Sequence, residues 1–457
     1  MLMRHKPRKN TIIILVSLTL LLAIACMPAA TPLPTTISIT IPTSKVTSTS
    51  TPSLTPTSTS IPLTLTPTSR PTKTPTPTAT PTPTPVPLPE MFHRVIPADE
   101  VFGGIGRLYS SPDGELWAIT EEGVARLEGG SWNLYLTDYT GRLAGIDGSG
   151  RVWVVSGDGS EISAWYGAPS PDGAPSGDGG SWTTYGTDAG WTPLTESWYH
   201  YAHGGYSDAL GRLWFATSQD VRVFDGERWI VFSPEDMGMG PPVGEDLDIV
   251  FGVAILESGT VWVRECEWGG PGPFGGRGVR WFDGSWHGAD SPVASGCATA
   301  IAEDGAGNVW LGVEEYLWRY EPASGAWTEF APPEPPIDGR FGFLHNLAVD
   351  PSGDPWPMIV ICGGASCYGS VALYRVRDGV WNQIGGVAEY DGTQRGPLFG
   401  ADGTPWVFWG WGVYRIVEDT PELMAPLYAR SIVMDGSGRV WFLAWYEGQD
   451  WLWALDI

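Results

Sequence analysis

One short motif recurs eight times between residues 105 and 457, and it constrains the fold more than any other feature of the chain. Each copy is an acidic, glycine-containing turn followed by an apolar residue or proline and then by tryptophan. Successive motif tryptophans lie between 35 and 61 residues apart. Periods near 40 to 50 residues with four short strands each are typical of β-propellers. The copies are Asp113 with Trp117, Asp147 with Trp153, Asp208 with Trp214, Glu257 with Trp262, Asp304 with Trp310, Asp350 with Trp356, Asp402 with Trp406 and Asp435 with Trp441.

The fifth repeat shows the strand pattern clearly. Asp304 opens its first turn, where the side chain can accept from backbone N–H groups and glycines can adopt positive φ. Short turns separate the expected strands, and no long amphipathic helix interrupts them. The sequence therefore predicts an all-β propeller of eight four-stranded antiparallel blades, with seven as the alternative because one 61-residue spacing is irregular. The expected strands of this repeat are 298–303, 308–313, 316–320 and 326–330.

The last repeat has only three expected strands, at 430–434, 439–445 and 451–457. The apolar segment 91–97 precedes the first repeat and has no place in it. We expect this segment to supply the missing outer strand, since such closure removes an open sheet edge. A second tryptophan recurs on the expected outer strands, where a large ring can pack between adjacent sheets. These residues are Trp132, Trp182, Trp229, Trp286, Trp327 and Trp381.

The N-terminus predicts export. Residues 1–25 carry basic residues and then an apolar run of 15 residues, which is too short for a comfortable membrane span and suits a signal peptide. The run ends Leu-Ala-Ile-Ala-Cys26, which resembles a bacterial lipobox. That resemblance implies cleavage before Cys26, lipidation of its thiol and stable anchoring by acyl chains. An ordinary secretory signal is the alternative.

Composition divides the rest of the chain into a stalk and a domain. Residues 26–90 are mostly Thr, Pro and Ser, cannot bury a core, and predict an extended stalk. Residues 91–457 form the predicted propeller, which carries 19 arginines, no lysine and 50 acidic residues, a net charge of −31. Such a surface repels phosphate backbones and anionic headgroups. We therefore expect no nucleic-acid partner, and membrane contact through the lipid anchor only.

Four cysteines remain besides Cys26, an even number that fits disulfides in an exported domain. Four cysteines allow three pairings. Cys266 is expected to end the second strand of the fourth blade, and Cys297 to begin the inner strand of the fifth blade on the same face. Cys362 and Cys367 bracket a four-residue loop. The blade assignment therefore predicts Cys266–Cys297 and Cys362–Cys367 disulfides.

The repeats resemble a known family. The pattern D-x-x-G-x-[VL]-W, followed by a Gly-Val-x-Arg strand and a Gly-x-x-Trp strand, is similar to the two-component regulator propeller repeat. The segments 123–132, 278–281 and 412–415 carry this pattern. The resemblance implies an extracytoplasmic, sensor-like module. Neither a membrane span nor a kinase follows the propeller in this sequence, so we expect a binding module rather than a direct signalling protein.

Loop lengths indicate where binding occurs. Turns between the second and third strands of each blade share one face with the connections between blades, and the acidic turns lie on the opposite face. Most long segments fall on the former, the long-loop face, and long loops on a rigid scaffold commonly bind partners. We expect an unknown ligand or protein there. These segments are 187–203, 233–245, 267–276, 331–343, 363–370 and 418–425.

Two of these segments supply candidate binding residues. Aromatic side chains in 187–203 can stack on a sugar or anchor a partner, or alternatively form a local cap over the second and third blades. The spacing of its two histidines suits a metal, but no third ligand lies near, so we predict no metal. An acidic rim fits Ca²⁺ chemically without indicating it, and we predict no cofactor. The candidates are Trp191, Trp198, Tyr199, His200, Tyr201, His203, Glu267 and Trp268.

Catalytic motifs are not found: the sequence has no Gly-x-Ser-x-Gly, His-Glu-x-x-His or phosphate-binding loop. We therefore predict a non-catalytic binding module. The alternative is a secreted propeller enzyme, a lyase or a glycan or lactone hydrolase, that uses acidic residues in the central channel. Glu265 and Glu267 are candidates for an acid/base pair if their environments separate their pKa values.

Overall fold

The computed structural model divides the chain into two compact units, residues 1–82 and 83–457, and only the second is described below. The description covers residues 88–457 except for short segments. Cys26, the expected signal peptide and most of the expected stalk therefore lie outside the described residues. Within the described part, no helix is long and apolar enough to cross a membrane. The excepted segments are 111–113, 138–141, 148, 157, 167–180, 195–202, 241–247, 270–271, 336–339, 364–365, 390–394, 411 and 436.

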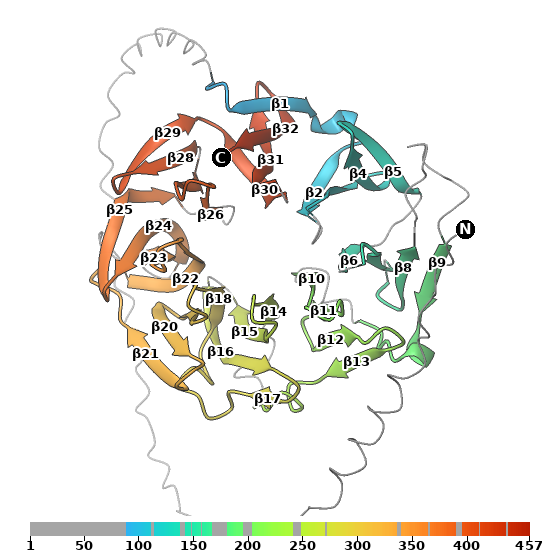
Figure 1. Ribbon diagram of the computed structural model, residues 1–457, viewed down its shortest axis with the longest axis horizontal. Coiled ribbons are helices and arrows are strands. Elements are labelled where there is room, and N and C mark those ends of the chain that lie inside the picture. Colours follow the sequence, from blue (N-terminus) through green and yellow to red (C-terminus); the bar gives the residue numbers. More distant parts are fainter. Residues whose placement is uncertain are drawn as a thin grey trace, which may run out of the picture. The chain divides into compact units, whose positions relative to one another are not determined.

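The described strands form six four-stranded sheets and one eight-stranded sheet, arranged as a ring with one strand of each repeat innermost (Figure 1). The first repeat contains β2 (Ile105–Ser110), β3 (Leu116–Thr120), β4 (Gly123–Glu128) and β5 (Ser131–Thr137). The second contains β6 (Arg142–Ile146), β7 (Val152–Val155), β8 (Ile162–Tyr166) and β9 (Ser181–Tyr185). The third contains β10 (His203–Ser207), β11 (Leu213–Ala216), β12 (Val221–Phe224) and β13 (Trp229–Phe232). The fourth contains β14 (Asp248–Ile255), β15 (Val261–Gly269), β16 (Gly272–Phe282) and β17 (Trp286–His287).

The remaining repeats follow the same order. The fifth contains β18 (Ala298–Glu303), β19 (Val309–Val313), β20 (Tyr316–Glu321) and β21 (Ala326–Phe330). The sixth contains β22 (Arg340–Val349), β23 (Pro355–Gly363), β24 (Ser366–Arg377) and β25 (Val380–Glu389). The seventh contains β26 (Arg395–Phe399), β27 (Pro405–Trp409), β28 (Gly412–Val417) and β29 (Thr420–Ala425). The last contains β30 (Tyr428–Met434), β31 (Arg439–Tyr446) and β32 (Gln449–Asp456), and the short 3-10 helices η1 (Ala98–Glu100) and η2 (Thr187–Ala189) lie in connections.

The N-terminal strand closes the ring, as the sequence predicted. β1 (Phe92–Pro97) pairs antiparallel with β32, from Phe92 opposite Leu455 to Pro97 opposite Trp451. Side chains reinforce the pairing, since the imidazole of His93 lies 2.9 Å from the Asp456 carboxylate. The last sheet thus has the order β1-β32-β31-β30, so that β32, the last strand of the chain, is not an edge strand.

The eight-stranded sheet consists of two meanders, β6–β9 and β10–β13, joined by parallel pairing of the inner strands β6 and β10. The pairing places Gly145 opposite Gly205. A Cβ atom on Gly145 would lie 2.8 Å from the Gly205 backbone, so only glycine permits this approach. The irregular 61-residue spacing, which left seven blades as the alternative, falls within this sheet.

A repeated hydrogen bond between aspartate and tryptophan explains the recurring motif. In five repeats, one carboxylate oxygen of the aspartate accepts from the indole N–H of the tryptophan six residues later, at 2.7–3.0 Å. The other oxygen accepts from the backbone N–H groups two and four residues later, at 2.8–3.1 Å. The five pairs are Asp147 with Trp153, Asp208 with Trp214, Asp304 with Trp310, Asp350 with Trp356 and Asp435 with Trp441.

The sequence predicted only part of this arrangement. It predicted that the aspartate accepts from backbone N–H groups of the turn. It did not predict the bond between the two side chains. Trp153, Trp214, Trp310, Trp356 and Trp441 are therefore polar partners of the turn as well as core residues. The carboxylate thereby ties the turn between the first two strands to the buried ring.

Two other copies lack an aspartate six residues before the tryptophan. Leu256 and Gly400 stand six residues before Trp262 and Trp406, and their backbones make the same turn without a carboxylate at that position. Asp402 lies four residues before Trp406 rather than six, and it accepts from the backbone N–H of Thr404 at 2.9 Å.

The acidic residues of the first and fourth copies are also not six residues before their tryptophans. Glu257 is displaced by one residue from the aspartate position, and the indole nitrogen of Trp262 has no hydrogen-bond partner among the described residues. Asp113 lies outside the described residues, although Trp117 is buried. The eight copies are thus equivalent in their tryptophans but not in their acidic residues.

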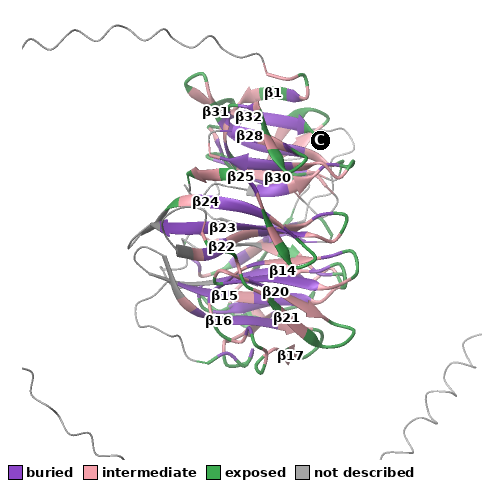
Figure 2. Ribbon diagram, turned by 90° about the vertical axis from the view of Figure 1, so that its left-hand side faces the viewer, coloured by how far each residue is buried: buried purple, intermediate pink, exposed green. Residues whose placement is uncertain are grey.

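Tryptophans and aliphatic residues form the core between neighbouring sheets. Trp153 and Trp229 illustrate the contact between repeats, with ring centroids 5.4 Å apart in an edge-on arrangement. The second set of tryptophans lies on the outer strands β5, β9, β13, β17, β21 and β25. Buried residues line the strands, and exposed residues gather at the turns (Figure 2). All eight motif tryptophans are buried: Trp117, Trp153, Trp214, Trp262, Trp310, Trp356, Trp406 and Trp441.

Cys266 was expected to end its strand, but it lies inside β15, which continues to Gly269. Cys266 and Cys297 form a disulfide with Cα atoms 4.2 Å apart, which links β15 to the residue directly before β18. Cys362 is also disulfide-bonded. The side chain of Cys367 lies outside the described residues, and the Cys362–Cys367 pairing therefore stays a prediction.

The turn carboxylates predict acid-sensitive stability. Burial alone would raise the pKa values of Asp304, Asp350 and Asp435, but the accepted hydrogen bonds outweigh it and lower all three below 3.8. A carboxyl with a depressed folded-state pKa stabilises the fold above its unfolded pKa and loses that contribution as pH falls through the folded value. Glu265, whose pKa burial raises, acts in the opposite direction but is one group against three.

We therefore expect the free energy of unfolding to fall as pH decreases from about 5 to 2. Urea unfolding at several pH values measures it. The Asp304→Asn variant, which cannot ionise, should be less stable at pH 7 and should show a smaller loss on acidification. A wild-type free energy that stays constant between pH 6 and 3 would contradict this account.

Candidate functional site

The aromatic segment expected to bind a ligand is partly interior. Trp191 is 1% exposed, and its indole N–H donates to the Gly159 carbonyl at 3.2 Å. Its ring also packs against Trp229 and lies 4.3 Å from the Arg222 guanidinium carbon. Trp191 is therefore unavailable for stacking on a ligand. Its contacts agree instead with the alternative interpretation, a local cap over the second and third repeats.

The other members of this segment are not placed together by the structure. Trp198, Tyr199, His200 and Tyr201 lie outside the described residues. His203 begins β10, but its side chain, like that of Trp268 in β15, also lies outside them. The ligand-binding role of these residues stays a prediction.

Glu265 and Glu267 are interior residues rather than a surface acid/base pair. Both are fully buried in β15, which continues to Gly269 and pairs there with Gly272 of β16. The described residues of the expected long segment 267–276 therefore belong to these two paired strands. Glu265 accepts from the Arg277 backbone N–H, and its other oxygen lies 3.5 Å from the Arg277 side chain. Burial raises the Glu265 pKa, but no substrate reaches a fully buried carboxyl.

Arginines around Glu265 fasten the connection between the third and fourth repeats. The Arg277 guanidinium donates to the Gly240 carbonyl at 3.2 Å, and Arg280 donates to the Gly238 carbonyl at 2.9 Å. Arg280 also donates to carbonyls of its own repeat. The buried charges of Glu265, Arg277 and Arg280 therefore have a structural role, since their bonds hold this connection against the fourth repeat. The expected loop 418–425 likewise differs, since its residues from Thr420 onward form the outer strand β29.

The motif tryptophans take no part in a surface site. They lie on the second strand of each repeat and are between 0% and 7% exposed, so no ligand reaches their rings. Trp214 packs against Phe232 and Phe282, Trp310 against Phe330, and Trp356 against Phe399. Trp441 belongs to the core between the last and first repeats. A binding site must therefore use tryptophans outside the repeat pattern.

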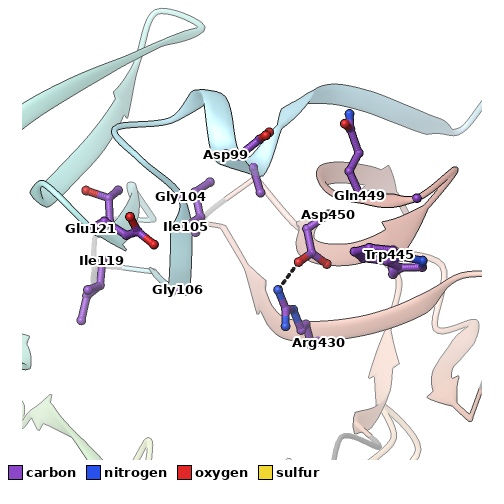
Figure 3. Close-up of a pocket in the computed structure, with 13 residues that line it drawn as sticks. Asp99, Gly104, Ile105, Gly106, Ile119, Glu121, Arg430, Trp445, Gln449 and Asp450 are labelled. Atoms are coloured by element: carbon purple, nitrogen blue, oxygen red, sulfur yellow. Dashed lines mark hydrogen bonds and ion pairs between the residues drawn. The ribbon is translucent and has the colours of Figure 1, made fainter.

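A pocket of about 450 Å³ lies between the first and last repeats. η1, the start of β2 and the β3–β4 turn form one wall, and β30 with the β31–β32 turn forms the other. Figure 3 shows Asp99 and Glu121 on the first side and Arg430, Trp445 and Asp450 on the second. Turns between second and third strands meet a connection between blades here, which places the pocket on the long-loop face.

The first wall depends on two glycines. Gly103 and Gly104 have φ angles of +82° and +138°, in the region that side-chain-bearing residues rarely adopt. A Cβ on Gly103 would lie 3.1 Å from the Glu121 Cβ. The Glu121 N–H donates to the Gly104 carbonyl at 3.2 Å, and the Glu122 N–H to Phe102. The segment after η1 is therefore held against the β3–β4 turn, with the Glu121 side chain packed over it.

The second wall presents an aromatic ring and an ion pair. Trp445 is 50% exposed, whereas every motif tryptophan is buried. Asp450 lies opposite Trp445 in the β31–β32 pairing and accepts from the Arg430 guanidinium. Asp99 and Glu121 are exposed and make no ion pair with any described residue. The pocket thus combines three carboxylates, one guanidinium and an accessible indole face.

This arrangement suits a cationic ligand. An indole face attracts a cation through its quadrupole, most strongly where water is displaced. Two carboxylates without ion-pair partners in the described part of the chain leave the lining with a net negative charge that can pair with an ammonium group. The strongly acidic domain raises the local concentration of cations further. No group of three or more potential metal ligands occurs among the described side chains.

Sequence reasoning missed all five of these residues. One signal was present: Trp445 belongs to neither recurring tryptophan position, so the repeat pattern does not account for it. The remaining residues come from opposite ends of the domain and meet only because β1 closes the ring.

Comparison with known proteins supports no family assignment: no protein-family model and no curated protein matches the chain. Similar solved structures include a catalytically inactive virginiamycin B lyase from Staphylococcus aureus with quinupristin, at 16% identity and a TM-score of 0.40, over 71% of this chain and 98% of that one. The extracellular domain of a putative one-component system from B. thetaiotaomicron is similar at 13% identity and a TM-score of 0.36, over 78% of this chain.

A GH74 xyloglucanase from Xanthomonas campestris is similar at 14% identity and a TM-score of 0.44, over 77% of this chain and 59% of that one. The chain spans about half the length of the B. thetaiotaomicron domain, 52%. Structural neighbours thus include extracellular domains of regulatory systems as well as enzymes. At these identities and TM-scores, the likenesses carry no argument about what this chain binds.

Proposed function

We propose that this protein is an extracytoplasmic, lipid-anchored, non-catalytic propeller that binds an amine-bearing ligand in the pocket between its first and last repeats. The observation that carries the proposal is the half-exposed Trp445 beside Asp99 and Glu121, two carboxylates without ion pairs among the described residues. The Cys266–Cys297 disulfide supports an oxidising compartment. The expected signal peptide and lipobox at Cys26 support export and anchoring.

Calorimetric titration of the detergent-solubilised full chain tests the ligand class. Glucosamine is compared with N-acetylglucosamine, and choline with its neutral isostere 3,3-dimethylbutanol. We expect the charged member of at least one pair to bind about tenfold or more tightly than its neutral counterpart, a difference of about 1.4 kcal/mol. The preference should weaken as salt rises from about 0.05 to 0.5 M, because exposed charges are screened (about 10 Å Debye length at 0.1 M).

Trp445→Ala should weaken binding of the preferred amine about tenfold, since it removes the indole face. The matched control is Trp182→Ala, which removes another partly exposed tryptophan (40% exposed) from the outer strand β9. Equal binding of the charged and neutral members of both pairs would contradict a cation site. Unchanged affinity in Trp445→Ala would exclude this pocket.

Anchoring is tested separately. Cys26→Ala removes the thiol that the lipobox resemblance implies is acylated, and two or more acyl chains are needed for stable anchoring. We expect the variant to leave the membrane fraction while its circular dichroism and unfolding remain those of the wild type. Membrane association that persists in the variant would contradict the lipid anchor but not the ligand site.

A further inference from the structure

A half-buried arginine near the centre of the ring makes no ion pair with any described residue. Arg264 lies on β15, the second strand of its repeat, and its guanidinium folds over the innermost strand β14. A Cβ on Gly252 of β14 would lie 2.7 Å from the guanidinium carbon, so this inward path requires glycine. The ring arrangement in Figure 1 places β14 beside β10 and β18, all three innermost.

The hydrogen-bonding capacity of Arg264 is largely unused within the described part of the chain. A guanidinium has five N–H donors. The structure gives Arg264 one bond there, to the Ala298 carbonyl of β18 at 3.5 Å, which is the limit of hydrogen-bond distance. By contrast, Arg222 and Arg277 pair with carboxylates, and Arg280 donates to four carbonyls.

An unneutralised, partly desolvated cation is costly to retain, and such groups occur preferentially at functional sites. Burial lowers the pKa of Arg264, and the Tyr206 phenol partly opposes this shift. The strand that carries Tyr206, β10, contacts β14, over which the Arg264 guanidinium lies. Tyr206 lies on the adjacent inner strand β10, is 49% exposed, and has a hydroxyl that can donate.

We propose that Arg264 and the Tyr206 hydroxyl form an anion subsite at the centre of the ring that binds a carboxylate group. Two N–H groups of the guanidinium donate to the two carboxylate oxygens, the geometry for which arginine is suited. The Tyr206 hydroxyl supplies a third donor. A monocarboxylate is favoured over a polyanion because the surrounding domain carries a net charge of −31. This subsite shares no residue with the pocket at Trp445, so it does not depend on the proposed function.

Titration of the full chain with acetate and benzoate, and separately with phosphate and sulfate, tests the subsite. The buffer contains no other oxyanion. We expect saturable 1:1 binding of a carboxylate. Arg264→Gln should weaken it at least about tenfold, and Tyr206→Phe about threefold to tenfold, because each removes a donor. Arg107→Gln is the matched control, since Arg107 is an exposed arginine on the inner strand β2 that also makes no ion pair with any residue described.

Tyr206→Phe keeps the test decisive if Arg264→Gln does not fold, because an exposed phenol contributes little to the core. Equal affinity in Tyr206→Phe and wild type, or in Arg264→Gln and wild type, would overturn the subsite. So would an equal loss in Arg107→Gln, or the absence of saturable binding by the wild type. Phosphate or sulfate binding more tightly than both carboxylates would overturn the carboxylate class.

Discussion

Replacing Trp153 with alanine should lower the free energy of unfolding by about 3–5 kcal/mol, the range for removing a large aromatic side chain from a core. Trp153 is fully buried between the second and third repeats. Its ring contacts Tyr185, Phe224 and Trp229, with centroids 4.6–5.4 Å apart. The substitution also removes the indole donor to Asp147, which lies 2.8 Å away and is itself buried. The turn carboxylate then loses one hydrogen bond.

Urea unfolding followed by tryptophan fluorescence and circular dichroism measures this loss. Trp182→Ala is the control, since Trp182 is 40% exposed on β9 and should change the unfolding free energy by less than about 1 kcal/mol. Equal effects of the two substitutions would show that the ring between repeats does not carry the packing described here. A smaller loss in Asp147→Ala than in Trp153→Ala is also expected, because that variant removes the hydrogen bonds but leaves the ring in place.

The fold was largely predictable because each repeat encodes its own strands. β18 and β21 have the bounds expected from the sequence, and β1 pairs with β32 as expected from the missing outer strand. The acidic motif was less well interpreted. The hydrogen bonds require aspartate six residues before tryptophan, a spacing that Asp402 and Glu257 do not have. Measuring the spacing back from each tryptophan would have separated these copies from the five at Trp153, Trp214, Trp310, Trp356 and Trp441.

The site was far less predictable, for two physical reasons. Whether an aromatic residue in a connection faces solvent depends on contacts far along the sequence. Trp191, for example, is buried by Phe215 and Trp229. The pocket, moreover, forms from segments more than 300 residues apart, such as those of Glu121 and Arg430. Only ring closure brings them together. The sequence predicted that closure, but not which side chains would meet where it occurs.

The Cys266–Cys297 disulfide is expected to contribute about 3–4 kcal/mol to stability. The two cysteines are 31 residues apart, and the chain-entropy model assigns about this value to a loop of that size. The bond joins β15 of the fourth repeat to the residue before β18 of the fifth, so it also restrains two neighbouring sheets. Each cysteine is 1% exposed, which makes the bond hard to reduce while the protein is folded.

The double variant that combines Cys266→Ala with Cys297→Ala should therefore unfold at lower urea concentration. Its free energy should also depend more steeply on denaturant, because the unfolded chain without the cross-link is less compact. Cys362→Ala is the matched comparison. If Cys362 pairs with Cys367, its loop is much shorter, and the same model assigns it a smaller loss. Peptide mapping of the non-reduced wild type identifies both pairs directly. A loss below about 1 kcal/mol in the double variant would show that the bond adds little to the packing between the fourth and fifth repeats. Free thiols at Cys266 and Cys297 would contradict the disulfide between β15 and the residue before β18, and with it the oxidising compartment that supports export.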